Sequence, residues 1–257
     1  MRRRQIVIIA RFTLLEAART RLFWLFAGAL LLVFGATFFV RQLAIIESAR
    51  LQIEFSAAAT RLVAVFMLCL HVLSSIVREF NDKGLELTLS FDLRRSDYVL
   101  GRLLGFGAVA LPLALIATLP QLLLAPLPAA LQWGASLALE LALMAALSVF
   151  CIVTFTHLIP AAAFVSAFYL LARALSAIRL ISATPIIDDN ALSHRVMSWL
   201  VEALALVVPA LDRFAAGAWL ADAAAGWGAI AANATQAALY VALLAAAAMF
   251  DFHRRNL

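Results

Sequence analysis

Two charged residues inside long apolar stretches, Glu140 and Arg173, are the first candidates for chemistry in this sequence. Ionisable groups inside a bilayer are costly, so they are usually paired with each other or used for function. The two stretches that contain them would cross a membrane in opposite directions, which places both charges at a similar depth. We therefore predict a Glu140–Arg173 ion pair. It would either fix the register of two neighbouring helices or line a path for a substrate.

A second candidate site is the charged stretch of residues 78–102, which lies between two apolar stretches. Its ten charged residues are Arg78, Glu79, Asp82, Lys83, Glu86, Asp92, Arg94, Arg95, Asp97 and Arg102. Apolar side chains interrupt these charges at Phe80, Leu85, Leu87, Leu89 and Phe91. An apolar patch with a polar rim is typical of a protein–protein interface, although a solvated loop held by its own salt bridges would have the same composition. We interpret the charged stretch as a docking surface.

Motifs of enzymatic catalysis are absent from the sequence. It contains no Gly-x-x-x-x-Gly-Lys-Ser/Thr loop for ATP phosphates, no HExxH and no GxSxG. The four histidines are scattered along the chain, at His71, His157, His194 and His253. Cys69 and Cys151 lie inside apolar stretches without metal-type spacing, and the adjacent acids Asp188 and Asp189 are usually just solvated. We expect that the chain is not an enzyme by itself and holds no metal or cofactor.

Six apolar stretches position these residues. Hydrophobic residues are 65% of the chain and charged residues 14%, whereas soluble domains are about half apolar and a quarter charged. A run of about 20 apolar residues crosses a bilayer as a helix. The sequence predicts an all-α polytopic membrane protein, one domain over residues 1–257. Its six transmembrane helices are expected near 22–40, 57–77, 98–124, 131–156, 160–181 and 228–249.

The arginines predict the orientation, because cytosolic loops of membrane proteins keep an excess of positive charge. Thirteen basic residues lie in three segments: before the first span, within the charged stretch, and at the C-terminus. The other side carries fewer, at Arg41, Arg50, Arg61, Arg195 and Arg213. Both termini and the charged stretch are therefore expected in the cytosol. The net charge of +5 needs no nucleic acid to explain it.

The N-terminal segment, residues 1–21, is predicted to be an amphipathic helix. Arg4, Arg11 and Arg19 fall within an arc of about 80° at 100° per residue. Ile6, Ile9, Thr13 and Ala17 lie elsewhere on the helical wheel. Such a helix would lie in the plane of the headgroups, with its arginines toward water and anionic lipid. A cytosolic extension of the first span is the alternative.

Two further segments carry local signals. Residues 182–227, between spans five and six, contain an apolar stretch from Val196 to Val208 that ends at Pro209 and is too short to span. We predict short interfacial or re-entrant helices there, with Trp199, Trp219 and Trp227 at the membrane–water boundary. In span three, Gly101 and Gly105 form a GxxxG that permits close approach of another helix, and Pro112 interrupts the helix.

The motifs of the chain, in this order, resemble those of the permease subunit of type-2 ABC exporters. The charged stretch is similar to the family's Arg-Glu pair, Gly-x-x-Glu, Leu-Ser, basic residue and Tyr-x-x-Gly-Arg/Lys. The matching residues are Arg78, Glu79, Gly84, Leu85, Glu86, Leu89, Ser90, Arg95, Tyr98, Gly101 and Arg102. VVPALDRF at 207–214 resembles the family's Pro-x-Leu-x-x-Phe, and the ending MFDFHRRNL its aromatic-then-arginine end. Within the family, the chain resembles small permeases such as those that accompany nitrous-oxide reductase maturation.

The resemblance implies the following arrangement. Residues 1–21 would be an elbow helix, 78–97 a cytosolic coupling loop and 182–227 an outside segment in the bacterial inner membrane. Two permeases would pair as a homodimer and dock on two ABC ATPase subunits, which bind the ATP and Mg. The implied ATPase-coupling residues are Arg78, Glu79, Phe80, Lys83, Gly84, Leu85 and Glu86. Membrane lipid is a further partner, and a periplasmic partner is left open.

Two other functions fit the same composition. An ion-coupled secondary carrier would use Glu140 and Arg173 and need no ATPase, although six spans without an internal repeat are unusual for a carrier. A membrane anchor for periplasmic partners would use residues 182–227. The sequence leaves open the substrate, the direction of transport and whether the two permeases are identical.

Overall fold

The protein is described here from a computed structural model over residues 2–43, 48–81, 95–183, 192–222 and 226–254. All regular elements in these ranges are helical, which confirms the all-α class. They are α1 (Arg2–Arg19), α2 (Leu22–Leu43), α3 (Ser48–Asn81), α5 (Arg95–Gln121), α6 (Leu127–Phe155), α7 (Leu158–Ala183), α8 (Leu192–Val207), η1 (Leu211–Arg213), α9 (Ala218–Ala221) and α10 (Trp227–Arg254).

Within the described ranges, six helices are long and apolar enough to cross a membrane, as the sequence predicts. They are α2, α3, α5, α6, α7 and α10. The second is longer than the apolar stretch near 57–77, because α3 continues through polar residues at its start. There Arg50 and Glu54 pair at 3.1 Å over one helical turn, which supports helix where hydrophobicity alone gives no signal. The chain is thus a multi-pass membrane protein.

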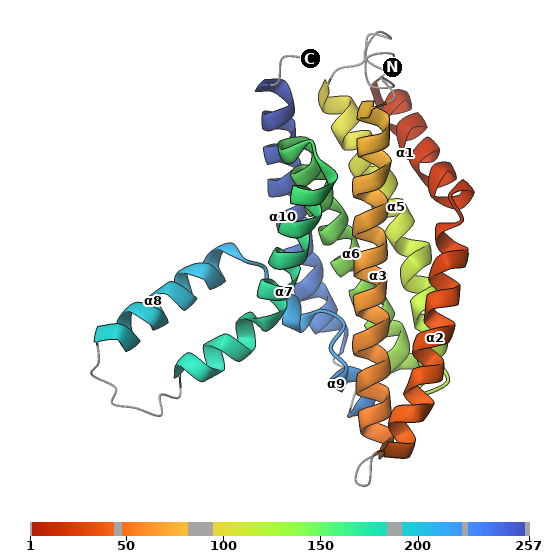
Figure 1. Cartoon of the computed structure of the whole chain (residues 1–257), viewed down its shortest axis with the longest axis vertical. Helices are drawn as coiled ribbons and strands as arrows, with labels where there is room; N and C mark the ends of the chain where they lie inside the picture. The colour runs from red at the N-terminus through yellow and green to blue at the C-terminus, as the bar shows by residue number, and fades with distance from the viewer. Residues whose placement is uncertain (1, 44–47, 82–94, 184–191, 223–225, 255–257) are drawn as a thin grey trace.

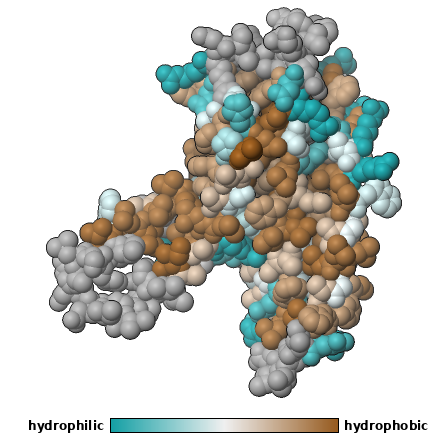
Figure 2. Space-filling view, viewed as in Figure 1, coloured by the Kyte–Doolittle hydropathy of each residue, from teal (hydrophilic) through white to brown (hydrophobic). Residues whose placement is uncertain are grey.

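The long helices form one bundle around α6 (Figure 1). In the most apolar part of α6, 72% of the residues are buried, against 17% in α2 and in α10. The central helix is therefore shielded by the others, while α2 and α10 show most of their apolar surface outward. Figure 2 shows that the visible surface is largely hydrophobic along the middle of the bundle and more hydrophilic towards its ends. This distribution suits a bundle surrounded by lipid.

Both chain termini lie at one end of the bundle (Figure 1). The last turn of α3 and the first turn of α5 lie at the same end. We call this end the terminal end. The three arginine-rich segments of the sequence therefore begin or end on a single side, as the predicted orientation requires.

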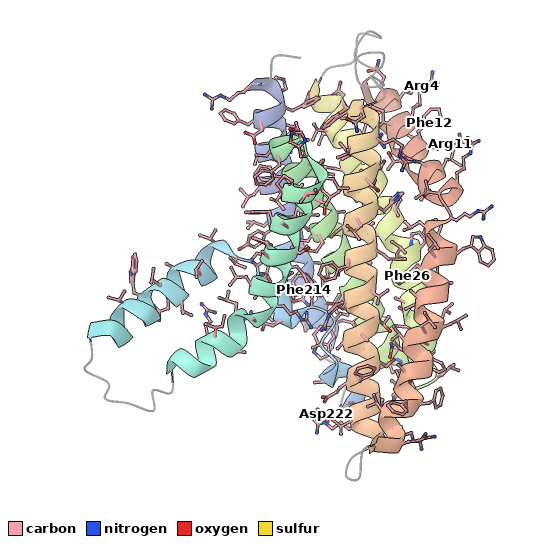
Figure 3. All side chains as sticks on the ribbon, viewed as in Figure 1. Arg4, Arg11, Phe12, Phe26, Phe214 and Asp222 are labelled. Atoms are coloured by element: carbon pink, nitrogen blue, oxygen red, sulfur yellow. The ribbon has the colours of Figure 1, made fainter. Side chains whose placement is uncertain are left out.

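Helix α1 lies against the glycine face of α5. A Cβ atom on Gly101 would lie 2.8 Å from Cβ of Ile9, and one on Gly105 would lie 2.6 Å from Cβ of Thr13. Only glycine therefore allows the two helices to approach this closely. The inner side of α1 is covered, while Arg4 and Arg11 project from its outer side (Figure 3).

The segment between the last two spans forms short helices, as predicted. The C-terminal part of α7 and all of α8 extend sideways from the bundle (Figure 1). Helix α8 ends at Val207, just before Pro209. The chain then returns to the bundle through η1, where Phe214 is fully buried (Figure 3). Ala215 follows with a positive φ of 44°, a backbone shape that is uncommon outside glycine and that a turn needs.

Candidate functional site

The structure covers three of the seven predicted coupling residues. Arg78, Glu79 and Phe80 lie in the last turn of α3. Arg78 is exposed, Glu79 is half-buried and Phe80 packs against the hydrophobic core. The other four lie outside the described residues, namely Lys83, Gly84, Leu85 and Glu86.

Arg102 organises the site at the terminal end. Its guanidinium is nearly buried, with 10% of the side chain exposed. Nη1 donates to Oε2 of Glu16 at 3.2 Å and to Oγ1 of Thr13 at 3.1 Å, both on α1. Nη2 pairs with Oε2 of Glu79 on α3. A single arginine of α5 thus joins α1 and α3.

Two neutral side chains complete this group. The hydroxyl of Tyr98 donates to Oε2 of Glu79 at 2.7 Å, and the hydroxyl of Ser75 donates to Oε1 of Glu16 at 2.7 Å. Both carboxylates therefore have a neutral donor as well as the guanidinium. We call this group the terminal network. Its residues are Thr13, Glu16, Ser75, Glu79, Tyr98 and Arg102.

The terminal network holds more acidic than basic side chains. Glu16 and Glu79 supply two negative charges against one guanidinium. The guanidinium also lies 5.9 Å from the ring centre of Tyr98 and 5.8 Å from that of Phe106, distances that allow cation–π attraction. Removing one partner of an ion pair that is shielded from water costs more stability than removing one partner of a surface pair, because it leaves an uncompensated charge.

The terminal network includes residues of both helices that flank the segment 82–94. Glu79 precedes this segment by less than one helical turn, while Tyr98 and Arg102 follow it within the first two turns of α5. Through these bonds α3, α5 and α1 are joined to one another next to the segment. Glu79 is therefore held inside the chain by Arg102 and Tyr98.

Sequence reasoning had matched Arg102 to a family motif but had not named it or Glu16 as site residues. One signal was available: Glu16 is the only acidic residue among the first 46. An isolated acid in an arginine-rich helix suggests a basic partner on another helix. The identity of that partner is not readable from local spacing.

The predicted Glu140–Arg173 contact is present between α6 and α7. Nη1 of Arg173 lies 3.6 Å from Oε1 of Glu140. The same Nη1 donates to the carbonyl oxygen of Phe214 at 2.9 Å and to that of Leu211. The carboxylate of Glu140 is fully buried, and its contact with Arg173 is longer than a hydrogen bond.

A third helix joins this buried cluster, which we define as Arg61, Glu140 and Arg173. Nη1 of Arg61 donates to the carbonyl oxygen of Ala215 at 2.7 Å. The indole Nε1 of Trp133 donates to the same oxygen at 2.9 Å. Both arginines of the buried cluster therefore donate to backbone carbonyl oxygens of the turn at 211–215. This favours a structural role, which anchors the turn inside the bundle, over a substrate path.

Asp188 and Asp189 lie outside the described residues. Comparison of the sequence with protein-family models and with curated proteins gave no match in either case. The functional conclusion therefore depends on the residues and contacts described above.

Proposed function

We propose that this chain is the transmembrane subunit of an ATP-driven ABC transporter, an exporter whose ATPase subunits are separate chains. The observation that carries the proposal is the terminal network, which ties both ends of the segment 82–94 to α1. The resemblance of the charged stretch to type-2 ABC exporter permeases adds a reason for an ATPase to dock there. Under this proposal the chain binds no nucleotide, and ATP and Mg belong to the partner.

The mechanism is mechanical. An ATPase that grips residues 78–97 would move the end of α3 and the start of α5 when it closes on ATP. The guanidinium of Arg102 transmits that movement to α1 through Glu16, so three helices shift as one unit. In a homodimer, two such units would move relative to each other and reshape the path between the permeases.

Under this proposal the predicted coupling residues have three roles. Arg78 is exposed and available to a docking partner. Lys83, Gly84, Leu85 and Glu86, which lie outside the described residues, are proposed to dock with it. Glu79 is bound to Arg102 and Tyr98, so it relays the movement inside the permease. Phe80 packs against the core and supports the end of α3.

The proposed location is the bacterial inner membrane, with both termini in the cytosol. The N-terminal helix, the C-terminal end of α10 and the two ends of the segment 82–94 share the terminal end of the bundle. An ATPase can reach only the cytosolic side, so this end would face the cytosol. The density of arginine in these segments agrees with that orientation.

One observation favours a second candidate, an ion-coupled carrier. The carboxylate of Glu140 is fully buried inside the bundle, 3.6 Å from the guanidinium of Arg173. Such a group could take up and release a proton during transport. The carrier would need no ATPase, which separates the two candidates experimentally.

The test is purification of the tagged chain from native membranes in mild detergent, with an ATPase assay on the eluate. We expect an ATPase subunit to co-purify and expect Leu85→Asp to abolish that co-purification. Leu123→Asp is the matched control, because Leu123 is exposed in the turn between α5 and α6 at the opposite end. An eluate without any ATPase contradicts the proposal, and Glu140→Gln would then be the first variant of the carrier to assay.

A second variant tests the relay. Glu79→Gln keeps the shape of the side chain but removes the charge that pairs with Arg102. We expect the ATPase subunit to remain bound while the stimulation of its ATP hydrolysis by the permease falls. Full stimulation in this variant would remove the terminal network from the mechanism and leave only the docking role of the charged stretch.

A further inference from the structure

A polar pocket of about 450 Å³ lies between the segment 212–219 and α10. Its volume is within the range of roughly 300–1,000 Å³ that ligand sites have. The polar lining consists of Asp212, Arg213, Trp219, Asn233 and Gln236, and alanines form the remaining wall. None of these residues belongs to the terminal network or to the buried cluster.

The walls of the pocket are held in place from behind. Asn233 is 4% exposed, and its Nδ2 donates to Oγ of Ser136 and to the carbonyl oxygen of Arg213, both at 3.1 Å. The same Oγ of Ser136 accepts the backbone N–H of Ala215 at 3.1 Å. Arg173 also fixes the turn, because its guanidinium donates to a carbonyl oxygen of the turn. A ligand would therefore enter a formed site and would lose little free energy to reorganisation.

The lining of the pocket carries two opposite charges on consecutive residues of η1, Asp212 and Arg213. Asp212 would repel a simple anion, and Arg213 would repel a simple cation. A zwitterion satisfies both, since its ammonium can bind the carboxylate of Asp212 and its phosphate can bind the guanidinium of Arg213. The indole of Trp219 adds a surface that attracts an ammonium group, and the amide of Gln236 adds further hydrogen-bonding groups.

An apolar track continues from the pocket along α10. Leu239 and Leu243 follow Gln236 at intervals of three and four residues, so the three share one side of the helix. Each leucine is 59% exposed. The track leads from the pocket towards the terminal end, and therefore into the membrane. A polar pocket with an apolar track below it has the shape of a site for an amphiphile.

We propose that this pocket binds the headgroup of a zwitterionic phospholipid, whose acyl chain lies along Leu239 and Leu243. The site uses α10 and the turn at 211–219, which lie apart from the charged stretch. The inference goes beyond transport and holds whether or not an ATPase docks at the terminal end.

The experiment titrates phosphatidylethanolamine and phosphatidylglycerol against the delipidated chain in detergent, with native mass spectrometry as the readout. We expect one phosphatidylethanolamine site per chain, about tenfold tighter than phosphatidylglycerol, because losing a charged hydrogen bond costs about tenfold or more in affinity. Asp212→Asn and Arg213→Gln should each weaken phosphatidylethanolamine binding by about tenfold. Circular dichroism and gel filtration would show that both variants remain folded.

Arg41→Gln is the matched control. Arg41 is exposed in the last turn of α2 and does not line the pocket, so its loss should leave binding unchanged. Equal affinity for the two lipids, or unchanged binding in both pocket variants, would overturn the site. Water-soluble glycerophosphoethanolamine separates the sources: if it binds as tightly as the intact lipid, the ligand is a free zwitterion and the assignment to a lipid is overturned.

Discussion

Replacing Arg102 with glutamine should loosen α1 from the bundle. The guanidinium of Arg102 contacts Glu16 and Thr13 on α1 and Glu79 on α3. Glutamine is shorter and neutral, so it cannot hold both carboxylates. The two acids would then face each other near the terminal end without a cation between them.

The size of the effect follows from burial. Breaking a buried ion pair by removing one partner costs about 3–5 kcal/mol. The exposed fraction of the side chain is 10% for Arg102 and 16% for Glu79, but 30% for Glu16. Water can therefore reach Glu16 in part, and we place the cost near the lower limit, at about 3 kcal/mol. For a chain of this size, about 2–4 °C per kcal/mol gives a fall in Tm of about 6–12 °C.

The native cysteines provide the assay. Cys69 is 3% exposed and Cys151 is fully buried. A thiol-reactive dye added to the purified chain in detergent will therefore report opening of the bundle as the temperature rises. No cysteine needs to be introduced, and the same samples can be followed by circular dichroism.

The matched control is Arg50→Gln. Arg50 bonds two acids, Glu54 and Asp222, as Arg102 does, but 47% of its side chain is exposed. Each of the two exposed pairs contributes about 0–1 kcal/mol, so the Tm should fall by less than it does in the Arg102 variant. Equal shifts for the Arg50 and Arg102 variants would refute the reasoning. A double variant with Glu79→Gln should recover part of the loss, because the unpaired charge is then removed.

Three further predictions concern packing and the buried cluster. Gly105→Ala should lower the Tm and expose α1 to protease, because its Cβ would clash with α1, whereas Gly107→Ala has nothing within 4 Å and should be neutral; equal behaviour of the two alanines would contradict the close packing. Glu140→Arg should reduce the folded yield by gel filtration, and adding Arg173→Glu should restore it only in part, because glutamate cannot donate to the turn carbonyls; full restoration would show that those bonds are dispensable. Trp133→Phe removes one hydrogen bond of about 1 kcal/mol and should lower the Tm by about 2–4 °C; an unchanged Tm would show that the bond contributes nothing.

The sequence was sufficient for features that depend on local composition. The six spans follow from apolar stretches of bilayer length, and the short helices after α7 follow from a stretch that is too short to span and ends at Pro209. The Glu140–Arg173 contact could also be predicted, because the position of each residue along its span gives its depth in the bilayer, and the two depths are similar. Each of these inferences uses distance along the chain or along the membrane normal.

The remaining contacts depend on which helices are neighbours, and sequence spacing does not determine that. Arg61 looked like one more arginine of the outer side, yet it lies 9% exposed and bonds the carbonyl of Ala215. The GxxxG face could have packed against any span, but it packs against α1, which is not among the six helices long and apolar enough to cross a membrane. The family resemblance implies an ATPase-coupling role for Glu79. Its bonds to Arg102 and Tyr98 are visible only in the structure.

The position of α1 has a consequence for biosynthesis. Glu16 leaves the ribosome long before its partner, since Arg102 is 86 residues further along the chain. At about 5–20 residues per second, this delay is on the order of 4–17 s. During that interval α5 does not exist, so the inner side of α1 has no glycine surface to pack against. The arginines on its outer side can hold α1 at the lipid headgroups until the third span is inserted. One helix would thus serve first as a temporary tether for the nascent chain and later as a permanent part of the bundle.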